Sequence, residues 1–161
     1  MIFVTVGTQL AFDRMVRVID AWAGRTEPRP EVVAQIGPSE FVPQHIDHRA
    51  FVEPGEFAEL AGRADAIVAH AGMGSIITAL TYGKPIVIMP RRADLGEQRN
   101  DHQLSTAARF AGRPGVFVAK DEHELPEILD SLRGLRAGEP IPPFADASLI
   151  ETIREFIDRG Q

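Results

Sequence analysis

Short strand-like segments that alternate with segments of helical periodicity constrain the fold of this chain more than any other feature. Six such segments occur, at residues 2–6, 32–36, 49–52, 66–69, 86–89 and 116–118. A short, largely apolar run that ends at a turn residue is typical of a strand buried on both faces of a parallel sheet. Each segment is therefore predicted to form one strand.

The intervening segments carry apolar residues on one helical stripe. The clearest stripe, spaced by three or four residues, consists of Phe12, Met15, Val16, Ile19, Trp22 and Ala23. Further stripes lie at residues 57–61, 73–80, 104–111, 125–132 and 149–157, and Gly83 is predicted to end the helix that begins near Met73. Strands that alternate with helices form right-handed βαβ units. The sequence thus predicts a doubly wound α/β fold with one parallel sheet.

Three of these helices begin with residue pairs that are typical of a capping box. The pairs are Asn100 with Gln103, Asp121 with Glu124, and Ser148 with Glu151. In each pair the first side chain is expected to accept a hydrogen bond from a first-turn amide, and the second to reach back to the start of the helix.

Length and composition predict one domain followed by a tail. A chain of 161 residues fits a single domain at the usual ~100–200 residues per domain. Residues 1–133 are expected to form it. Residues 134–146 are rich in proline and glycine and are predicted to be an extended tether, and residues 147–161 a terminal amphipathic helix whose apolar stripe needs a surface to bury against.

Several classes of function are disfavoured by the composition. The absence of cysteine excludes disulfides, thiol catalysis and thiolate metal sites. A net charge of -6 argues against nucleic-acid binding, which needs a basic face. No segment has the ~20 apolar residues of a membrane-spanning helix, and the first residues lack signal-peptide features. His45, Asp47 and His48 form a loose cluster that is predicted to be a solvated loop, so no metal is expected.

Ligand sites in open parallel sheets lie at the carboxyl ends of the strands. Three predicted strands are followed by candidate segments, at residues 7–9, 70–75 and 90–103. The strongest is 70–75 (His-Ala-Gly-Met-Gly-Ser), because its glycines admit close backbone approach while Ser75 and helix amides can donate to an anion. It lacks the third glycine of a dinucleotide fingerprint, since Ile77 stands there, and Pro85 after Gly-Lys excludes a phosphate-binding loop of the NTPase type. The alternative is that these glycines only make a tight turn.

Four motifs in this order resemble the Alg13-type and PssE-type glycosyltransferase subunits, relatives of the carboxyl-terminal half of MurG-like GT-B enzymes (family 28). The motifs lie at residues 3–8, 70–75, 83–85 and 100–103, and the resemblance covers residues 1–133. It implies a single Rossmann-like domain that binds a UDP-sugar without a cofactor or metal. It further implies a membrane-anchored Alg14- or PssD-like partner, a lipid-linked glycan acceptor as in exopolysaccharide synthesis, and a cytoplasmic location at the inner membrane face.

The resemblance also assigns residues to roles. Its nucleotide and diphosphate positions correspond to Gly7, Thr8, His70, Gly72, Met73, Gly74 and Ser75, and its donor-sugar positions to Asp101, His102 and Gln103. Thr78 stands where relatives place a glutamate that binds the ribose hydroxyls. His70 and the helix amides are expected to neutralise the departing diphosphate, with Arg91 or Arg92 assisting at the mouth. The catalytic base is expected in the partner.

Two other readings and two open points accompany this interpretation. A non-catalytic nucleotide-sugar-binding or scaffold subunit would use the same binding residues. A complete small enzyme such as a UDP-sugar epimerase is disfavoured by length. The transferred sugar stays open, because the PssE resemblance suggests glucuronic acid and the Alg13 resemblance N-acetylglucosamine. Homo-oligomerisation through the terminal helix is also open.

Overall fold

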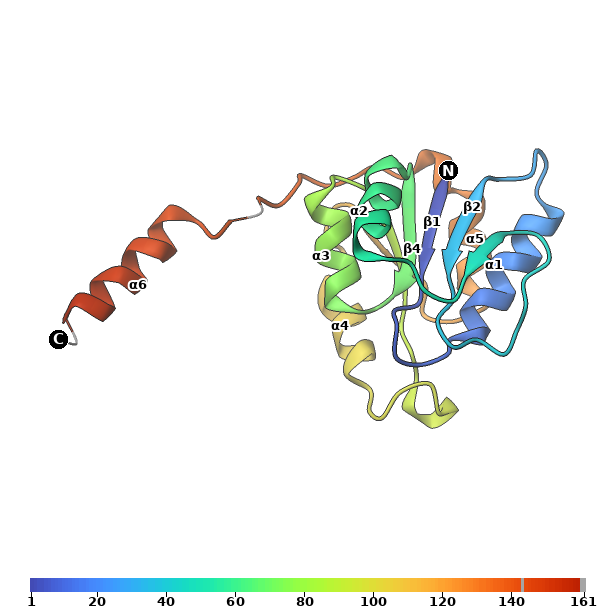
Figure 1. The fold of residues 1–161 in the computed structure, drawn as a ribbon, viewed down its shortest axis with the longest axis horizontal. Coiled ribbons are helices and arrows are strands. Elements are labelled where there is room, and N and C mark those ends of the chain that lie inside the picture. The colour runs from blue at the N-terminus through green and yellow to red at the C-terminus, as the bar shows by residue number, and fades with distance from the viewer. Residues whose placement is uncertain (143, 160–161) are drawn as a thin grey trace.

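One parallel sheet organises the protein, as a computed structural model that describes residues 1–142 and 144–159 shows. All of its strand pairs are parallel, and the strand order is β3-β2-β1-β4-β5-β6 (Figure 1). The strands are β1 (Ile2–Thr5), β2 (Val32–Gln35), β3 (Asp47–Arg49), β4 (Ala66–His70), β5 (Ile86–Met89) and β6 (Val116–Val118). The predicted doubly wound fold is confirmed. The strand order reverses beside β1 and β4, which is where such sheets bind ligands.

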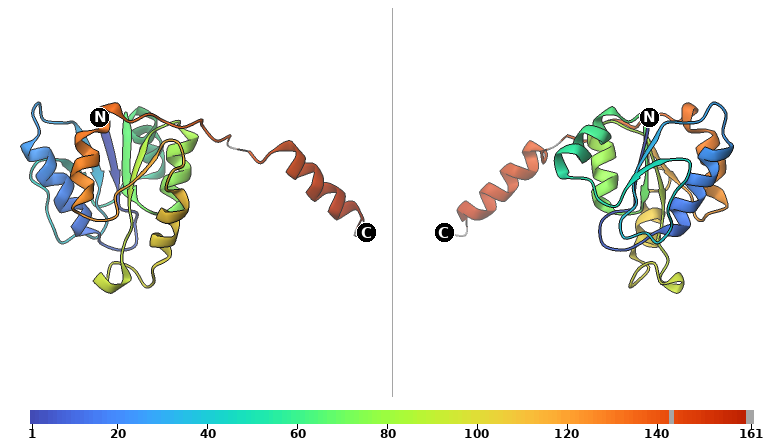
Figure 2. Two further views of the ribbon diagram at one scale, coloured as in Figure 1. Left: turned by 180° about the vertical axis from the view of Figure 1, so that it is seen from behind. Right: turned by 45° about the vertical axis from the view of Figure 1, so that its right-hand side comes forward.

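Helices cover both faces of the sheet. They are α1 (Asp13–Arg25), α2 (Pro54–Arg63), α3 (Met73–Thr81), α4 (His102–Phe110) and α5 (Glu124–Asp130). The described chain also contains a terminal helix, α6 (Ala147–Arg159), and short 3-10 turns η1 (Ala93–Leu95) and η2 (Leu132–Gly134). Figures 1 and 2 show α1 and α5 on one face and α2, α3 and α4 on the other. Each face has its own buried apolar cluster.

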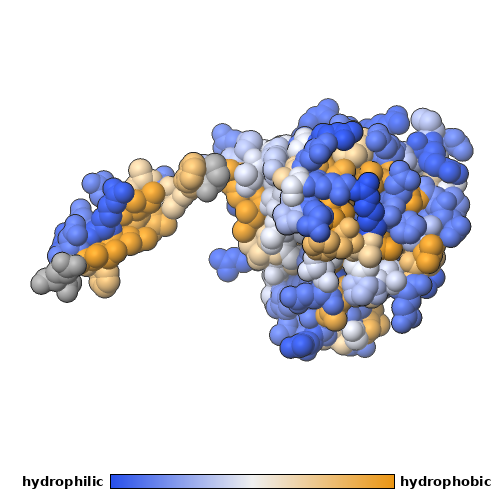
Figure 3. All heavy atoms as spheres, viewed as in Figure 1, coloured by the Kyte–Doolittle hydropathy of each residue, from blue (hydrophilic) through white to orange (hydrophobic). Residues whose placement is uncertain are grey.

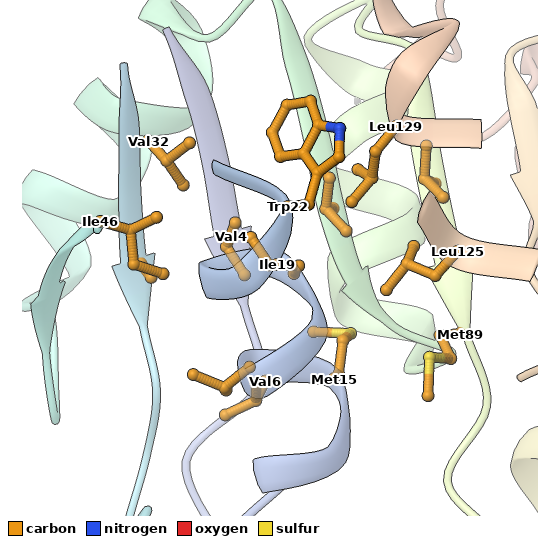
Figure 4. Close-up of a cluster of buried hydrophobic side chains, with 14 of the residues drawn as sticks. Val4, Val6, Met15, Ile19, Trp22, Val32, Ile46, Met89, Leu125 and Leu129 are labelled. Carbon is orange, nitrogen blue, oxygen red and sulfur yellow. The ribbon is translucent and has the colours of Figure 1, made fainter. Parts of the chain in front are cut away.

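The predicted stripe of α1 forms the centre of one cluster. Met15, Ile19 and Trp22 point from α1 toward the sheet and meet Leu125 and Leu129 of α5 (Figure 4). All five side chains are buried, and burial of each contributes on the order of 1.5–3 kcal/mol. The Trp22 Nε1–H also donates to Asp130 Oδ1 at 2.8 Å, which fixes α5 against α1. This packing gives α1 a rigid base from which its first turn approaches the carboxyl edge of the sheet.

The third strand differs from the prediction. It spans Asp47–Arg49, so the expected strand at residues 49–52 and the expected loop position of Asp47 and His48 are both wrong. The strand pairs Asp47–Arg49 with β2, the Gly37 amide still donates to Ala50 O at 3.0 Å, and the Val52 amide then bonds to Gln35 Oε1 at 3.0 Å in place of a backbone carbonyl. Among the described residues no group of three His, Asp or Glu side chains gathers as a metal site.

The capping predictions held only in part. Asp121 Oδ1 accepts the His123 and Glu124 amides as expected, although Glu124 bonds the Lys120 amide instead of that of Asp121. At α6 the prediction was wrong, because Asp146 caps the helix by accepting both the Ser148 amide and its hydroxyl. At α4 Asn100 Oδ1 accepts the His102 amide at 3.2 Å as expected, but Gln103 does not reach back to the start of the helix and turns inward instead. By contrast Gly83 ends α3 as predicted, at φ +61°, followed by a Lys84 amide bond to Ala79 O.

The tail is held to the body only along its first part. The Ile141 amide donates to Leu80 O at 3.2 Å, and Ile141 packs on the second apolar cluster. Beyond it, α6 extends away from the domain in every view (Figures 1 and 2) and exposes an apolar stripe along its length (Figure 3). The parts of the tether and helix predictions that fall on Pro143, Gly160 and Gln161 lie outside the described residues. In the described part of the chain, no helix combines the length and apolarity needed to cross a membrane.

Candidate functional site

Three loops at the carboxyl edge of the sheet line two adjoining cavities, the first two of them both cavities and the third only the smaller one. They are the β1–α1 loop, the β4–α3 turn and the β5–α4 loop, which are the three segments that the sequence singled out. The cavities measure about 310 and 450 Å³ and share Gly7, Thr8, His70 and Gly74 as a common wall. A larger apolar cavity of about 840 Å³ lies along β6 and contains none of the predicted site residues.

The smaller cavity is polar and lies against the start of α3. Its lining includes the side chains of Thr8, Gln9, Gln98, His102 and Gln103. The first turn of α3 has no side-chain cap, and its first helical bond is that of the Ile76 amide to Gly72 O. The amides of residues 73–75 are therefore free to bind an anion, which the positive end of the helix dipole also favours.

His70 lies between two glycines at the centre of the shared wall. A Cβ atom on Gly72 would lie 2.2 Å from His70 Nε2, and one on Gly7 would lie 3.1 Å from Cε1 of the same ring. These glycines therefore leave room for the imidazole. Gly74 differs, because a Cβ there would meet nothing within 4 Å. Its missing side chain keeps both cavities open.

The His70 ring is neutral at pH 7. Burial, and then the nearby positive charge of Arg91, lower the His70 pKa to about 4. The Nδ1 atom lies 3.4 Å from Thr5 O, a carbonyl that can only accept, so Nδ1 carries the proton of the neutral ring. Nε2 then faces the glycines as an acceptor. The positive charge that the sequence interpretation assigned to His70 requires uptake of a proton.

Arg91 is not at the mouth of the site, as the sequence suggested, but beneath it. Its side chain is 2% exposed, and its guanidinium donates to the carbonyls of Val6, Leu10, Ala11 and Glu97. These bonds join the β1–α1 loop to the β5–α4 loop. Four of the five guanidinium N–H groups are engaged in these bonds. Arg91 therefore supplies positive charge to the polar cavity but has no free pair of N–H groups with which to bind a carboxylate.

Arg92 cannot assist at the mouth either. Its guanidinium forms an exposed, bidentate pair with Asp94 at 3.0 and 2.6 Å, and it lines neither site cavity. The pair keeps the pKa of the Asp94 carboxyl below its usual range, through the hydrogen bonds from Arg92 first.

The predicted donor-sugar residues separate in the structure. His102 and Gln103 line the polar cavity, whereas Asp101 lines neither cavity and accepts the Ala93 amide at 2.9 Å. Gln103 is buried, and its Oε1 accepts the Arg91 amide at 3.1 Å. This bond, instead of a capping box, is what orients the glutamine and leaves its amide nitrogen for a ligand.

The larger site cavity has an apolar wall that the sequence analysis missed. Phe51, Val52, Pro54 and Phe57 line it opposite Thr78 and Ser75. The signal was available, because Phe51 and Val52 end the predicted strand at 49–52, Pro54 and Phe57 follow it, and the carboxyl-end rule applies there as well. Thr78 Oγ1 donates to Gly74 O at 2.8 Å, so its hydroxyl can only accept from a ligand.

Residues 1–133 match a known protein family, described as the glycosyltransferase family 28 C-terminal domain. The chain is 31% identical over 121 residues to a UDP-N-acetylglucosamine–N-acetylmuramyl-(pentapeptide) pyrophosphoryl-undecaprenol N-acetylglucosamine transferase of Parasynechococcus marenigrum (strain WH8102), covering 71% of this chain and 32% of that protein. It is 29% identical over 125 residues to the UDP-N-acetylglucosamine transferase subunit ALG13 of Homo sapiens, covering 72% of this chain and 11% of that protein. The chain thus spans a third or less of the length of these relatives.

A solved structure shares the fold over nearly its whole length. The solution structure of ALG13 superposes with a TM-score of 0.59 at 17% identity, and the alignment covers 94% of this chain and 93% of that one. At this identity the likeness supports the arrangement of strands and helices.

Proposed function

Because this chain belongs to the glycosyltransferase family 28 C-terminal domain family, we propose that it is the donor-binding half of an inverting glycosyltransferase that uses a UDP-sugar. The acceptor half is a separate, membrane-anchored chain, and the product is a lipid-linked glycan of the exopolysaccharide type. In this proposal the described domain supplies one wall of the active site.

The pair of adjoining cavities carries this proposal. The apolar wall of Phe51, Pro54 and Phe57 suits a uracil ring, and Thr78 on the opposite wall suits the ribose. The diphosphate then lies at the shared wall, against the amides of residues 73–75, and the sugar extends toward His102 and Gln103. The order of apolar, anion-binding and polar surfaces matches the order of groups along a UDP-sugar.

Transfer requires stabilisation of the leaving group and a base. The acceptor hydroxyl oxygen bonds to the anomeric carbon while the bond to the diphosphate oxygen breaks, and UDP departs with the electron pair. The helix amides and the buried charge of Arg91 face the departing UDP. No Asp or Glu stands among the described residues that line the two cavities. The imidazoles of His70 and His102 also line them, and we assign His70 to the diphosphate and His102 to the donor sugar, so the proposal places the base in the partner and requires no metal.

Calorimetric titration of the purified chain tests the proposal. UDP is expected to bind, and UDP-glucuronate and UDP-N-acetylglucosamine to show which sugar adds affinity, while the proposed uridine site predicts weaker binding of ADP and GDP. Equal binding of the three nucleoside diphosphates would contradict a uridine site.

A second function is favoured by the same missing carboxylate, namely a nucleotide-sugar-binding subunit without catalysis. The two are separated by adding the membrane-anchored candidate partner and measuring sugar transfer to lipid in the presence of EDTA. Transfer that depends on both chains supports the enzyme. Binding of UDP-sugar without transfer supports the non-catalytic subunit.

Gly74 and Gly55 offer a matched test of where the nucleotide lies. Each is the second residue of a helix, and a Cβ on either meets nothing within 4 Å. Alanine at either position should raise stability by about 0.5–1 kcal/mol. Only Gly74→Ala adds a methyl group to both cavities, so it should weaken UDP binding by about tenfold. Equal UDP affinities of the two variants, measured by calorimetry, would place the nucleotide elsewhere.

Thr78→Glu is expected to tighten UDP binding. The threonine offers one accepting hydroxyl on the cavity wall, whereas a carboxylate can accept both ribose hydroxyls, an additional hydrogen bond that is worth up to about tenfold in affinity. Ile77→Glu is the control, because it adds the same charge one residue away at an exposed position outside both cavities. Unchanged or weaker affinity of Thr78→Glu in calorimetry would contradict the ribose position.

A further inference from the structure

An ion pair between α1 and the β5–α4 loop (residues 90–101) lies behind the polar cavity. Arg14 donates through Nε and a terminal nitrogen to the two oxygens of Glu97, both at 2.7 Å. The two side chains are 14% and 11% exposed. A bidentate pair of this geometry fixes orientation as well as distance, and burial protects it from screening by salt.

Arg14 also binds the start of this loop and a residue of a second loop. It donates to Pro90 O at 3.2 Å, where the loop leaves β5, and to Glu122 at 2.7 Å, in the segment between β6 and α5. Arg14 belongs to the first turn of α1, which is itself packed on the sheet. The loop is thereby tied to the packed helix α1.

Glu97 closes the loop on itself. Its second oxygen accepts the Arg92 amide at 2.9 Å, its own amide donates to Arg92 O at 3.1 Å, and its carbonyl accepts from Arg91. Gln98, the next residue, lines the polar cavity. Loss of the Glu97 side chain therefore acts on the neighbouring Gln98, whereas the bond from Arg91 uses the Glu97 backbone carbonyl and is kept.

We propose that Arg14 and Glu97 are positioning residues that set the donor-sugar end of the site. They touch neither cavity themselves. They hold the loop whose residues, Gln98 and the adjoining His102 and Gln103, face the position of the sugar. The nucleotide end is built from β4, α3 and residues 51–57, so the clamp governs discrimination among sugars and leaves UDP binding intact. The inference rests on the proposed function and names the residues that control which donor sugar the site prefers.

The test separates the sugar from the nucleotide. Affinities for UDP, UDP-glucuronate and UDP-N-acetylglucosamine are measured by calorimetry for the wild type, Arg14→Ala, Glu97→Ala and the double variant. The quantity compared is the ratio of the affinity for the preferred UDP-sugar to the affinity for UDP. This ratio should fall about tenfold in each single variant, because loss of a supporting contact misplaces the groups that bind the sugar. The double variant should lose no more than either single variant, because the two residues act as a unit. Arg14→Lys and Glu97→Gln, which keep the size of the side chains but lose the fork, serve if the alanine variants fail to fold.

Asp20→Ala is the matched control. Asp20 lies on the same helix, is more deeply buried than Arg14 and Glu97, and accepts the Gln44 and His45 amides and the His45 ring instead of binding the sugar loop. The Asp20→Ala variant should be less stable but should keep the gain in affinity that the sugar adds to UDP. The inference is overturned if the Arg14 and Glu97 variants bind UDP and keep this gain unchanged, or if Asp20→Ala loses the gain equally. It is also overturned if the wild type gains no affinity from either sugar. Absence of UDP binding by the wild type would instead defeat the proposed function, and this inference with it.

Discussion

Arg91→Ala is expected to lower the free energy of unfolding by roughly 3–5 kcal/mol, a large share of the ~5–15 kcal/mol that stabilises a typical domain. The buried guanidinium donates to four carbonyls of two loops, and its loss leaves these acceptors without a donor. The same change removes the fixed positive charge beneath the polar cavity, so UDP binding should be lost with the loop structure. Chemical denaturation and calorimetry measure the two effects.

Arg92→Ala is the control for this experiment. The two arginines are neighbours, but Arg92 is paired with Asp94 at the surface, and its removal should change neither stability nor UDP affinity beyond error. If Arg91→Ala is too unstable to purify, Arg91→Lys replaces it in the experiment. The lysine keeps the charge but cannot reach all four carbonyls, so the variant should fold with a free energy of unfolding below that of the wild type. A stability of Arg91→Ala equal to that of Arg92→Ala would contradict the central role of the buried guanidinium.

The strands were predictable where burial on both faces of the sheet requires a continuous run of apolar residues. β1, β4 and β5 are enclosed on both faces, so nearly every residue in them is apolar and fully buried. β3 is an edge strand whose three residues, Asp47–Arg49, are all exposed. After it, the Val52 amide bonds to the side chain of Gln35 instead of a backbone carbonyl. A contact between residues 17 apart leaves no local pattern.

The site was predictable to the level of loops but not of individual contacts. The glycines at residues 70–75 and the carboxyl-end rule located the shared wall. They did not reveal that Gly7 and Gly72 leave room for His70, since that depends on how β1 and β4 lie side by side. Arg91 follows Pro90 in a polar loop, which resembles a surface arginine. Its burial comes from carbonyls about 80 residues earlier in the chain.

Binding of a UDP-sugar is expected to be accompanied by uptake of a proton at His70. In the ligand-free protein its pKa is about 4, and Nε2 faces the glycines without a hydrogen. A diphosphate at this wall attracts the charged imidazolium and can accept a hydrogen bond from a protonated Nε2. Binding therefore raises the pKa of His70. Between the two pKa values the affinity should fall by up to tenfold for each unit that the pH rises, because only the protonated ring donates to phosphate.

Without ligand the same group acts on stability in the opposite direction. The unfolded chain binds a proton near pH 6.5 and the folded chain only near pH 4, so acidification through this window should destabilise the domain. His70→Gln should remove that loss and should weaken UDP-sugar binding by about tenfold to a hundredfold at pH 6, the value of a hydrogen bond to a charged group. His123→Gln, at an exposed position outside both cavities, should change neither property.

Calorimetry with UDP-N-acetylglucosamine in two buffers of different ionisation enthalpy counts the protons taken up. The sugar nucleotide is the right probe, because its diphosphate has no group that titrates near neutral pH, whereas UDP itself does. Proton uptake in the wild type and its loss in His70→Gln would establish that the imidazole becomes charged on binding and joins Arg91 in facing the leaving group. Binding heats that do not depend on the buffer would mean that the ring stays neutral, and that the helix amides and Arg91 alone stabilise the departing UDP.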